Sequence, residues 1–236
     1  MDLSSFSDGF IVIKNNLAYF VWGNYPEGSI GGIILTLILS LSAIIIASVF
    51  GVIAGIGLTI LIGWQHKLLV LILSFLRAIP ILMLIFWTFF LLPMIFNVDV
   101  PAIATVILAL ALIGSAYIAY AVYAGMITVS VEQWQAAYSL GLNRQQVIRY
   151  IILPQAIRMM MPSFVNQWVS LIKDSSLAYI VSVAEFTFLA TKVNNRSMVY
   201  PTEIFLFVIV VYFIICYALN LLVSCLTKRK KPLMFN

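Results

Sequence analysis

Long apolar runs, separated by short polar segments, dominate the pattern along the chain. Each run could form a helix of about 20 residues, the length that crosses a hydrocarbon core of about 30 Å. Because backbone groups in lipid must be bonded within their own segment, helices are the expected form. Pro162–Ser182 is a further apolar segment, but it carries Lys173 and Asp174. Four runs contain no Asp, Glu, Lys or Arg: Gly28–His66, Ala78–Val98, Val100–Val131 and Ile204–Thr227.

Composition agrees with this pattern. Hydrophobic residues make up 64% of the chain and charged residues 9%, which is too little polar surface for a soluble domain of this size. We therefore predict an all-α integral membrane protein with about five transmembrane helices. The net charge of +5 does not indicate nucleic-acid binding, because the basic residues gather beside the predicted spans. By the positive-inside tendency, the N-terminus is expected outside and the C-terminus in the cytoplasm.

Enzymatic chemistry finds no support in the sequence. The single histidine, His66, excludes a Ser-His-Asp triad, and no His, Cys or acidic cluster has the spacing of a metal site. No G-x-x-x-x-G-K-[ST] loop is present to bind nucleotide phosphates. We expect no catalytic residue, no metal and no cofactor in this chain.

One polar island, Gln135–Pro154, interrupts the apolar pattern and must lie at a membrane face. We predict one helix over Thr128–Leu140, closed by Gly141 in the left-handed conformation. Asn143 should cap a second helix with Gln146 in the reciprocal position. Pro154 is expected to end the regular hydrogen bonding. The second helix has an apolar stripe made by Val147, Ile148, Ile151 and Ile152.

The island also carries a resemblance to a known family. Gln135-Ala136-Ala137, Gly141 and Ile151-x-Leu153-Pro154 are similar to the coupling motif E-A-A-x3-G-x9-I-x-L-P of the membrane subunits of ABC importers. From residue 32 to about residue 190 the chain resembles the polar amino-acid permease branch, and Leu76–Met83 resembles glutamate/aspartate permeases. The matching segments are Gly32-x3-Thr36-Leu37-x2-Ser40, Arg77-x-x-Pro80, Leu153–Arg158 and Leu171–Leu177.

This resemblance implies a type I ABC importer permease fold in a bacterial inner membrane. It implies as partners a second permease subunit, two ATPase subunits that bind ATP and Mg, and an external amino-acid-binding protein. It also implies an external or interfacial segment at residues 1–28, a transmembrane domain at 29–227 with a coupling loop at about 128–160, and a cytoplasmic basic tail at 228–236. The residues expected to couple the chain to the ATPases are Gln135, Ala136, Ala137, Gly141, Asn143, Ile151, Leu153 and Pro154.

Three departures from the family pattern concern charge. Gln135 stands where the motif usually has Glu, and Glu132 replaces a usual Gly. Tyr120 and Tyr123 occupy positions that often carry Glu and Arg. The spacing and the glycine hinge are intact, so we expect coupling to persist with altered contacts.

Charges inside predicted spans point to a pathway. The second span is predicted to run from near Leu68 to Pro93. Arg77 is about 14 Å beyond its start and Lys173 about 16 Å beyond Pro162, at 1.5 Å per residue. A charge at mid-depth costs about 2.5–3.5 kcal/mol, so it usually faces a cavity or a partner. In one interpretation Arg77 or Lys173 receives an amino-acid carboxylate and Asp174 its ammonium group. In the other, Arg77 and Asp174 form an ion pair between two spans.

Ser175 is a further candidate for the pathway. Together with Ser176 it could bond back to the helix backbone and allow a local break. Two cations against one acid at mid-depth favour acidic amino acids as substrates. The alternative to an ATP-driven importer is a self-contained secondary carrier or channel; few membrane acids, no internal repeat and a polar cytoplasmic loop disfavour it.

Overall fold

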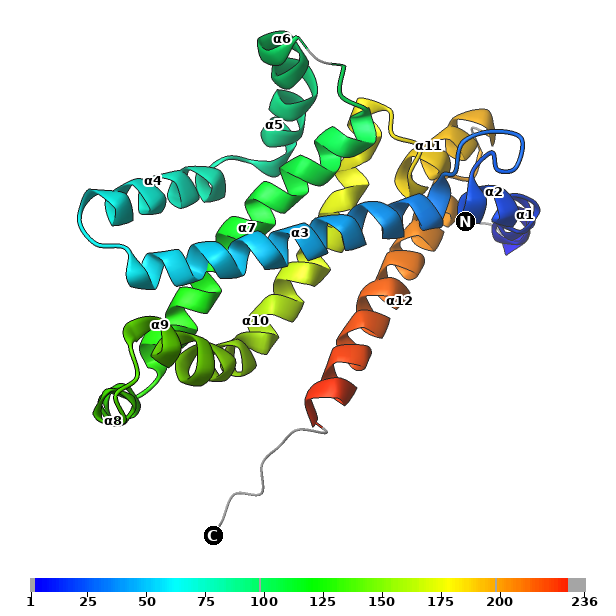
Figure 1. Cartoon of the computed structure of the whole chain (residues 1–236). Coiled ribbons are helices and arrows are strands. Elements are labelled where there is room, and N and C mark those ends of the chain that lie inside the picture. Colours follow the sequence, from blue (N-terminus) through cyan, green and yellow to red (C-terminus); the bar gives the residue numbers. More distant parts are fainter. Residues whose placement is uncertain (1–2, 98, 198, 229–236) are drawn as a thin grey trace. The chain divides into compact units, whose positions relative to one another are not determined.

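The computed structural model describes residues 3–97, 99–197 and 199–228, and helices account for most of them (Figure 1). Of the predicted basic tail, residues 229–236 lie outside the described part. The predicted all-α class is confirmed. In chain order the helices are α1 (Leu3–Asn15), α2 (Leu17–Trp22), α3 (Gly32–Ile60), α4 (Trp64–Ala78), α5 (Ile81–Phe86), a π-helical turn (Trp87–Leu91), α6 (Leu92–Phe96), α7 (Ala102–Thr128), α8 (Val131–Ser139), α9 (Arg144–Val147), a second π-helical turn (Ile148–Ile152), α10 (Leu153–Asp174), a 3₁₀ helix (Ser175–Val181), α11 (Phe186–Ser197) and α12 (Pro201–Lys228).

Three of the described helices, α3, α7 and α12, are long and apolar enough to cross a membrane. Helix α4 together with Ile81–Phe96 makes a fourth candidate if this bent pair is counted as one span. The predicted Pro162–Ser182 span corresponds to the second half of α10 and the 3₁₀ helix. Helix α10 has 22 residues and begins earlier than predicted, so Pro162 lies inside it.

The second predicted span is broken, which the sequence prediction of one continuous helix from Leu68 to Pro93 missed. Helix α4 and the segment Ile81–Phe96 meet at an angle of 102°. Ile79 is extended, with φ −77° and ψ 131°. Proline disfavours the helical conformation in the residue before it, so Pro80 explains the break. The predicted depth of Arg77 assumed an unbroken helix and therefore loses its basis.

The chain divides into two compact units. The first is drawn from Met1–Leu41, Phe89–Val106 and Ile172–Asn236, and the second from Ser42–Thr88 and Ile107–Leu171.

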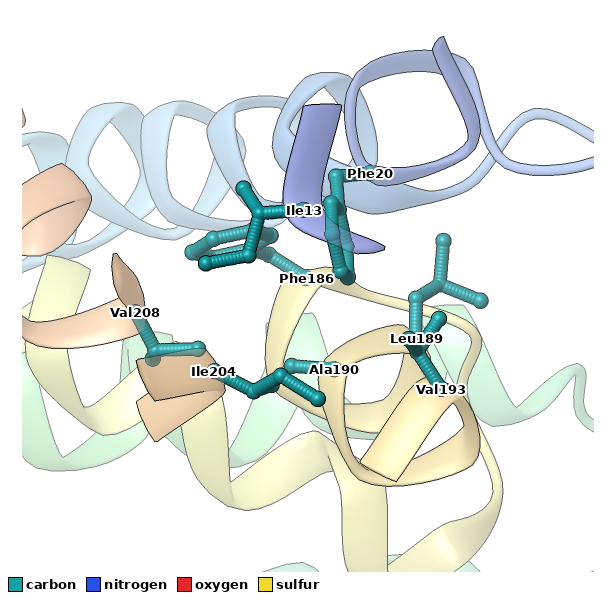
Figure 2. Close-up of a cluster of buried hydrophobic side chains, with 8 residues drawn as sticks. All are labelled: Ile13, Phe20, Phe186, Leu189, Ala190, Val193, Ile204 and Val208. Carbon is teal, nitrogen blue, oxygen red and sulfur yellow. The ribbon is translucent and has the colours of Figure 1, made fainter. Parts of the chain in front are cut away.

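The core of the first unit joins the N-terminal helices to the last two helices (Figure 2). Phe20 of α2 is fully buried, and its ring meets the Phe186 ring edge-on with the centroids 6.0 Å apart. Ile13 of α1 and Ile204 of α12 belong to the same cluster. Ile13 and Phe20 therefore anchor α1 and α2 in this unit. The predicted position of residues 1–28 at the outer membrane face stays a prediction.

The second unit depends on a close approach of α3 and α7. A Cβ atom added to Gly51 would lie 2.6 Å from Cβ of Ile118, and one added to Gly55 would lie 2.6 Å from Cβ of Val122. Such distances exclude any larger side chain unless the helices separate. Small residues in membrane helices allow this kind of backbone contact.

Candidate functional site

The polar island folds into two short helices, α8 and α9, between α7 and α10. The predicted single helix over Thr128–Leu140 is wrong in one respect, because α7 ends at Thr128 and α8 begins at Val131. Ser130 between them is extended, with φ −59° and ψ 147°. The predicted coupling loop, at about residues 128–160, thus contains the end of α7, both short helices and the start of α10.

The predicted hinge and cap are confirmed. Gly141 has φ +78°, in the left-handed region that favours glycine. Asn143 Oδ1 accepts a hydrogen bond from the Gln146 amide, and Gln146 Oε1 accepts one from the Asn143 amide, both at 2.9 Å. This reciprocal pair starts α9 without help from elsewhere in the chain. The angle between the two helices is therefore encoded locally.

The apolar stripe is also confirmed. Val147, Ile148 and Ile152 are buried, and Ile151 is half-buried. The expectation that Pro154 ends the hydrogen-bonding pattern is wrong, because Pro154 is the second residue of α10. The π-helical turn runs into α10 without a gap, so the helical path continues through Pro154 even though proline has no amide hydrogen to donate.

The rest of the predicted coupling set lies mostly on the loop surface. Gln135, Ala136, Gly141, Asn143 and Pro154 are exposed, Leu153 is half-buried and Ala137 is buried. Large apolar side chains are exposed beside them: Leu140 is 78% exposed and Tyr150 64%. An exposed apolar patch of this kind is typical of a protein-binding surface.

Glu132 adds a fixed charge to this surface. Its own backbone amide and the Ser130 side chain donate hydrogen bonds that hold the pKa of Glu132 below its usual value. Glu132, which replaces a usual glycine, is thus ionised at neutral pH. It lies four residues before the exposed Ala136 on the same helix.

Arg77 lies against two tyrosines of α7. Its guanidinium carbon is 4.5 Å from the centroid of the Tyr120 ring and 5.0 Å from that of Tyr117. The Tyr120 hydroxyl is also hydrogen bonded to Ser74 at 3.0 Å. Tyr120, at one of the two positions where the family pattern often carries a charge, thus makes a cation–π contact with Arg77. Arg77 and Asp174 belong to different units, so both interpretations of these charges stay predictions.

Lys173 lines a cavity of about 450 Å³ in the first unit. The polar groups in its wall are the Lys173 ammonium, the hydroxyls of Ser176, Thr187 and Tyr212, and the Cys216 thiol. Val208, Ile209 and Phe213 complete the lining, whereas Asp174 is not part of it. The Tyr212 hydroxyl donates to Glu185 and is bonded to the Thr187 hydroxyl, so the Lys173 ammonium group is the donor best suited to a carboxylate here.

The predicted break at Ser175 is confirmed. Ser175 Oγ donates a hydrogen bond to the Ile172 carbonyl at 2.7 Å, and the side chain is buried. At this residue the chain changes from α10 to the 3₁₀ helix.

Sequence reasoning missed Glu185, a fully buried acid just before α11. Its carboxylate accepts hydrogen bonds at 2.8 Å from the backbone amides of Thr187 and Phe188, and so caps α11. The hydroxyl of Tyr212 donates to the same carboxylate at 3.1 Å, and that of Thr36 at 3.4 Å. Burial outweighs these bonds and raises the pKa of Glu185 to about 7. The hydroxyl residues Thr36 and Ser40, within an apolar run, were the available sign in the sequence that a buried polar partner exists.

A family comparison matches residues 47–232 with the description "Binding-protein-dependent transport system inner membrane component". The chain belongs to this family. The match covers the coupling loop, Arg77 and Lys173, and thus every predicted site residue. The resemblance based on the loop motif is confirmed at the family level.

Relatives of this chain are named as amino-acid permeases. The L-cystine transport system permease protein TcyB of Bacillus subtilis is 33% identical over 134 residues, 57% of each chain. The glutamate/aspartate import permease protein GltK of Escherichia coli is 38% identical over 115 residues, 49% of this chain and 51% of that protein. The chain thus spans about half the length of the curated relatives it matches.

Solved structures share the fold of nearly the whole chain. An amino acid ABC transporter crystallised with histidines matches with a TM-score of 0.77 and 24% identity, over 97% of this chain and 99% of that chain. The MetNI methionine ABC transporter, in an inward-facing conformation, matches with a TM-score of 0.70 and 16% identity, over 90% and 97%. The predicted type I importer permease fold is confirmed.

Proposed function

We propose that this chain is the permease subunit of an ATP-driven importer of polar amino acids, with acidic amino acids as the leading substrates. Two ATPase subunits bind ATP and Mg and dock on the coupling loop. A second permease subunit completes the pathway, and an external binding protein delivers the substrate. The chain spans a bacterial inner membrane, with its N-terminus outside and its C-terminus in the cytoplasm.

The coupling loop is the observation that carries this proposal. The turn between its two helices is built from local features, the positive φ of Gly141 and the Asn143–Gln146 cap. Its outer surface presents Leu140, Tyr138 and Tyr150 to a partner. The loop is covalently joined to α7 and α10, so a partner that moves it also pulls on both helices.

The Lys173 cavity supports a carboxylate-bearing substrate. Lys173 supplies a charged donor, and most of the lining is apolar. A volume of about 450 Å³ is large enough for an amino acid with bound water. The names of relatives mention cystine, glutamine and glutamate/aspartate. All of these amino acids carry an α-carboxylate, and they differ in the side chain.

Replacing Gly141 with Val tests the loop proposal. Valine is strained at φ +78°, although a Cβ at this position meets nothing within 4 Å. We expect Gly141→Val to insert normally and to lose most ATPase binding and amino-acid uptake. Co-purification of the ATPase and uptake by proteoliposomes measure this.

Gly63→Val is the matched control. Gly63 has φ +69° and also has nothing within 4 Å of an added Cβ, but it lies between α3 and α4. Both variants place valine at a positive φ, but at different places in the chain. Equal uptake by wild type and Gly141→Val, or equal losses in both variants, would contradict the assignment of the loop.

A further inference from the structure

Arg144, the first residue of α9, reaches from the coupling loop to the end of α3. Its Nη2 atom donates a hydrogen bond to the Thr59 carbonyl oxygen at 2.8 Å. Thr59 is the second-last residue of α3, which ends at Ile60. The last four carbonyls of a helix have no partner within it and carry the negative end of the helix dipole. A guanidinium group therefore has two reasons to bind there.

This end of α3 is also attached firmly to α7. Thr59 Oγ1 contacts Sδ of Met126 at 3.5 Å. One turn earlier, an added Cβ on Gly55 would lie 2.7 Å from the Ala119 carbonyl oxygen, so the two backbones are in direct contact. A displacement applied to Thr59 is consequently shared by α3 and α7.

We infer that Arg144 is a positioning residue for transport, which transmits movement of the coupling loop to α3. The loop is covalently connected only to α7 and α10, and the Arg144–Thr59 bond adds α3 to the helices that it moves. This inference rests on the proposed function, because it requires an ATPase that moves the loop. It concerns an unspecified position within the coupling motif, since Arg144 is none of the eight residues expected to couple.

Arg149 provides a matched control in the same loop. It carries the same charge, is exposed like Arg144, and lies over the ring of its neighbour Tyr150 at 5.6 Å from the centroid. Arg144→Ala and Arg149→Ala thus remove the same charge from the same surface, and Arg144→Ala alone removes the contact with α3.

The experiment uses the assembled complex of permease, ATPase and binding protein in proteoliposomes. ATP hydrolysis and amino-acid uptake are measured together. We expect Arg144→Ala to keep ATPase binding and hydrolysis and to raise the ATP consumed per amino acid about fivefold, within the range that loss of one hydrogen bond produces. Arg149→Ala should leave this ratio at the wild-type value, and Arg144→Lys, which keeps a charged donor, should restore part of it.

Hydrogen exchange gives a second readout that does not depend on activity. The amides of residues 57–61 should exchange faster in Arg144→Ala than in Arg149→Ala. An unchanged ratio in Arg144→Ala, the same change in both alanine variants, or loss of ATPase binding in Arg144→Ala would each overturn the inference. Failure of the wild-type chain to bind any ATPase would instead overturn the proposed function.

Discussion

Glu185 is a buried acid whose charge depends on pH. Its pKa in the folded chain is about 7, against an ordinary value of 4.5, so the folded state binds the proton more tightly than the unfolded state does. Stability from this group is therefore complete below about pH 4.5 and decreases as the pH rises towards 7.

We expect Glu185→Gln to remove this dependence, because glutamine cannot ionise. The variant has a lower melting temperature overall, since an amide nitrogen cannot accept one of the two α11 backbone bonds. The measurement is the melting temperature in detergent at about pH 5 and about pH 8, compared with Glu27→Gln, an exposed acid. If the melting temperature falls equally between about pH 5 and about pH 8 in wild type and in Glu185→Gln, Glu185 does not titrate in this range.

Cys216 offers a direct probe of the Lys173 cavity, because its thiol is in the wall. With Cys225 replaced by Ser, Cys216 is the one remaining cysteine of the chain. Glutamate should slow labelling of Cys216 by a small thiol reagent in the assembled complex, and a primary amine without a carboxylate should not. Lys173→Gln should abolish the protection, because it removes the ammonium group that receives the carboxylate. Equal protection by the amine would contradict a carboxylate site.

Among the elements, the start of α3 depends on one glycine. Gly32 has φ +63°, and an added Cβ would lie 2.1 Å from the Phe20 carbonyl oxygen. Gly63 has a similar φ of +69° but no such neighbour. We expect Gly32→Ala to lower the free energy of unfolding by about 2 kcal/mol or more beyond Gly63→Ala, the cost of forcing atoms into a packed site.

Thermal unfolding in detergent measures this difference. Both variants place alanine at a positive φ, and only Gly32→Ala also brings a Cβ against the Phe20 carbonyl oxygen. Equal melting temperatures would mean that α2 and α3 separate easily, and the packed arrangement around Phe20 would then be wrong.

Local features of the elements were predictable from the sequence. The Gly141 hinge, the Asn143–Gln146 cap and the Ser175 bond each depend on residues within five positions of one another, and all three are observed. The break before Pro80 could also have been predicted, since proline acts on its immediate neighbour.

Other features depend on residues far apart and were not predictable. The Arg144–Thr59 bond joins positions 85 residues apart, and the bond of Thr36 to Glu185 joins positions 149 apart. The Lys173 cavity likewise needs side chains of α10, α11 and α12. Periodicity and composition place these residues on helices but do not say which helices meet.

For the molecule as a whole, the central claim is that the coupling loop faces the cytoplasm and is bound there by a separate ATPase. Leu140, 78% exposed next to Gly141, is the best reporter of both points. Leu140→Cys is made in a chain whose Cys216 and Cys225 are replaced by Ala, so that it is the single thiol.

The decisive measurement is labelling of Leu140→Cys by a membrane-impermeant maleimide in intact cells and in inside-out vesicles, with and without the ATPase. We predict labelling only in inside-out vesicles, and protection when the ATPase is bound. Labelling in intact cells, or labelling that the ATPase leaves unchanged, would contradict the account.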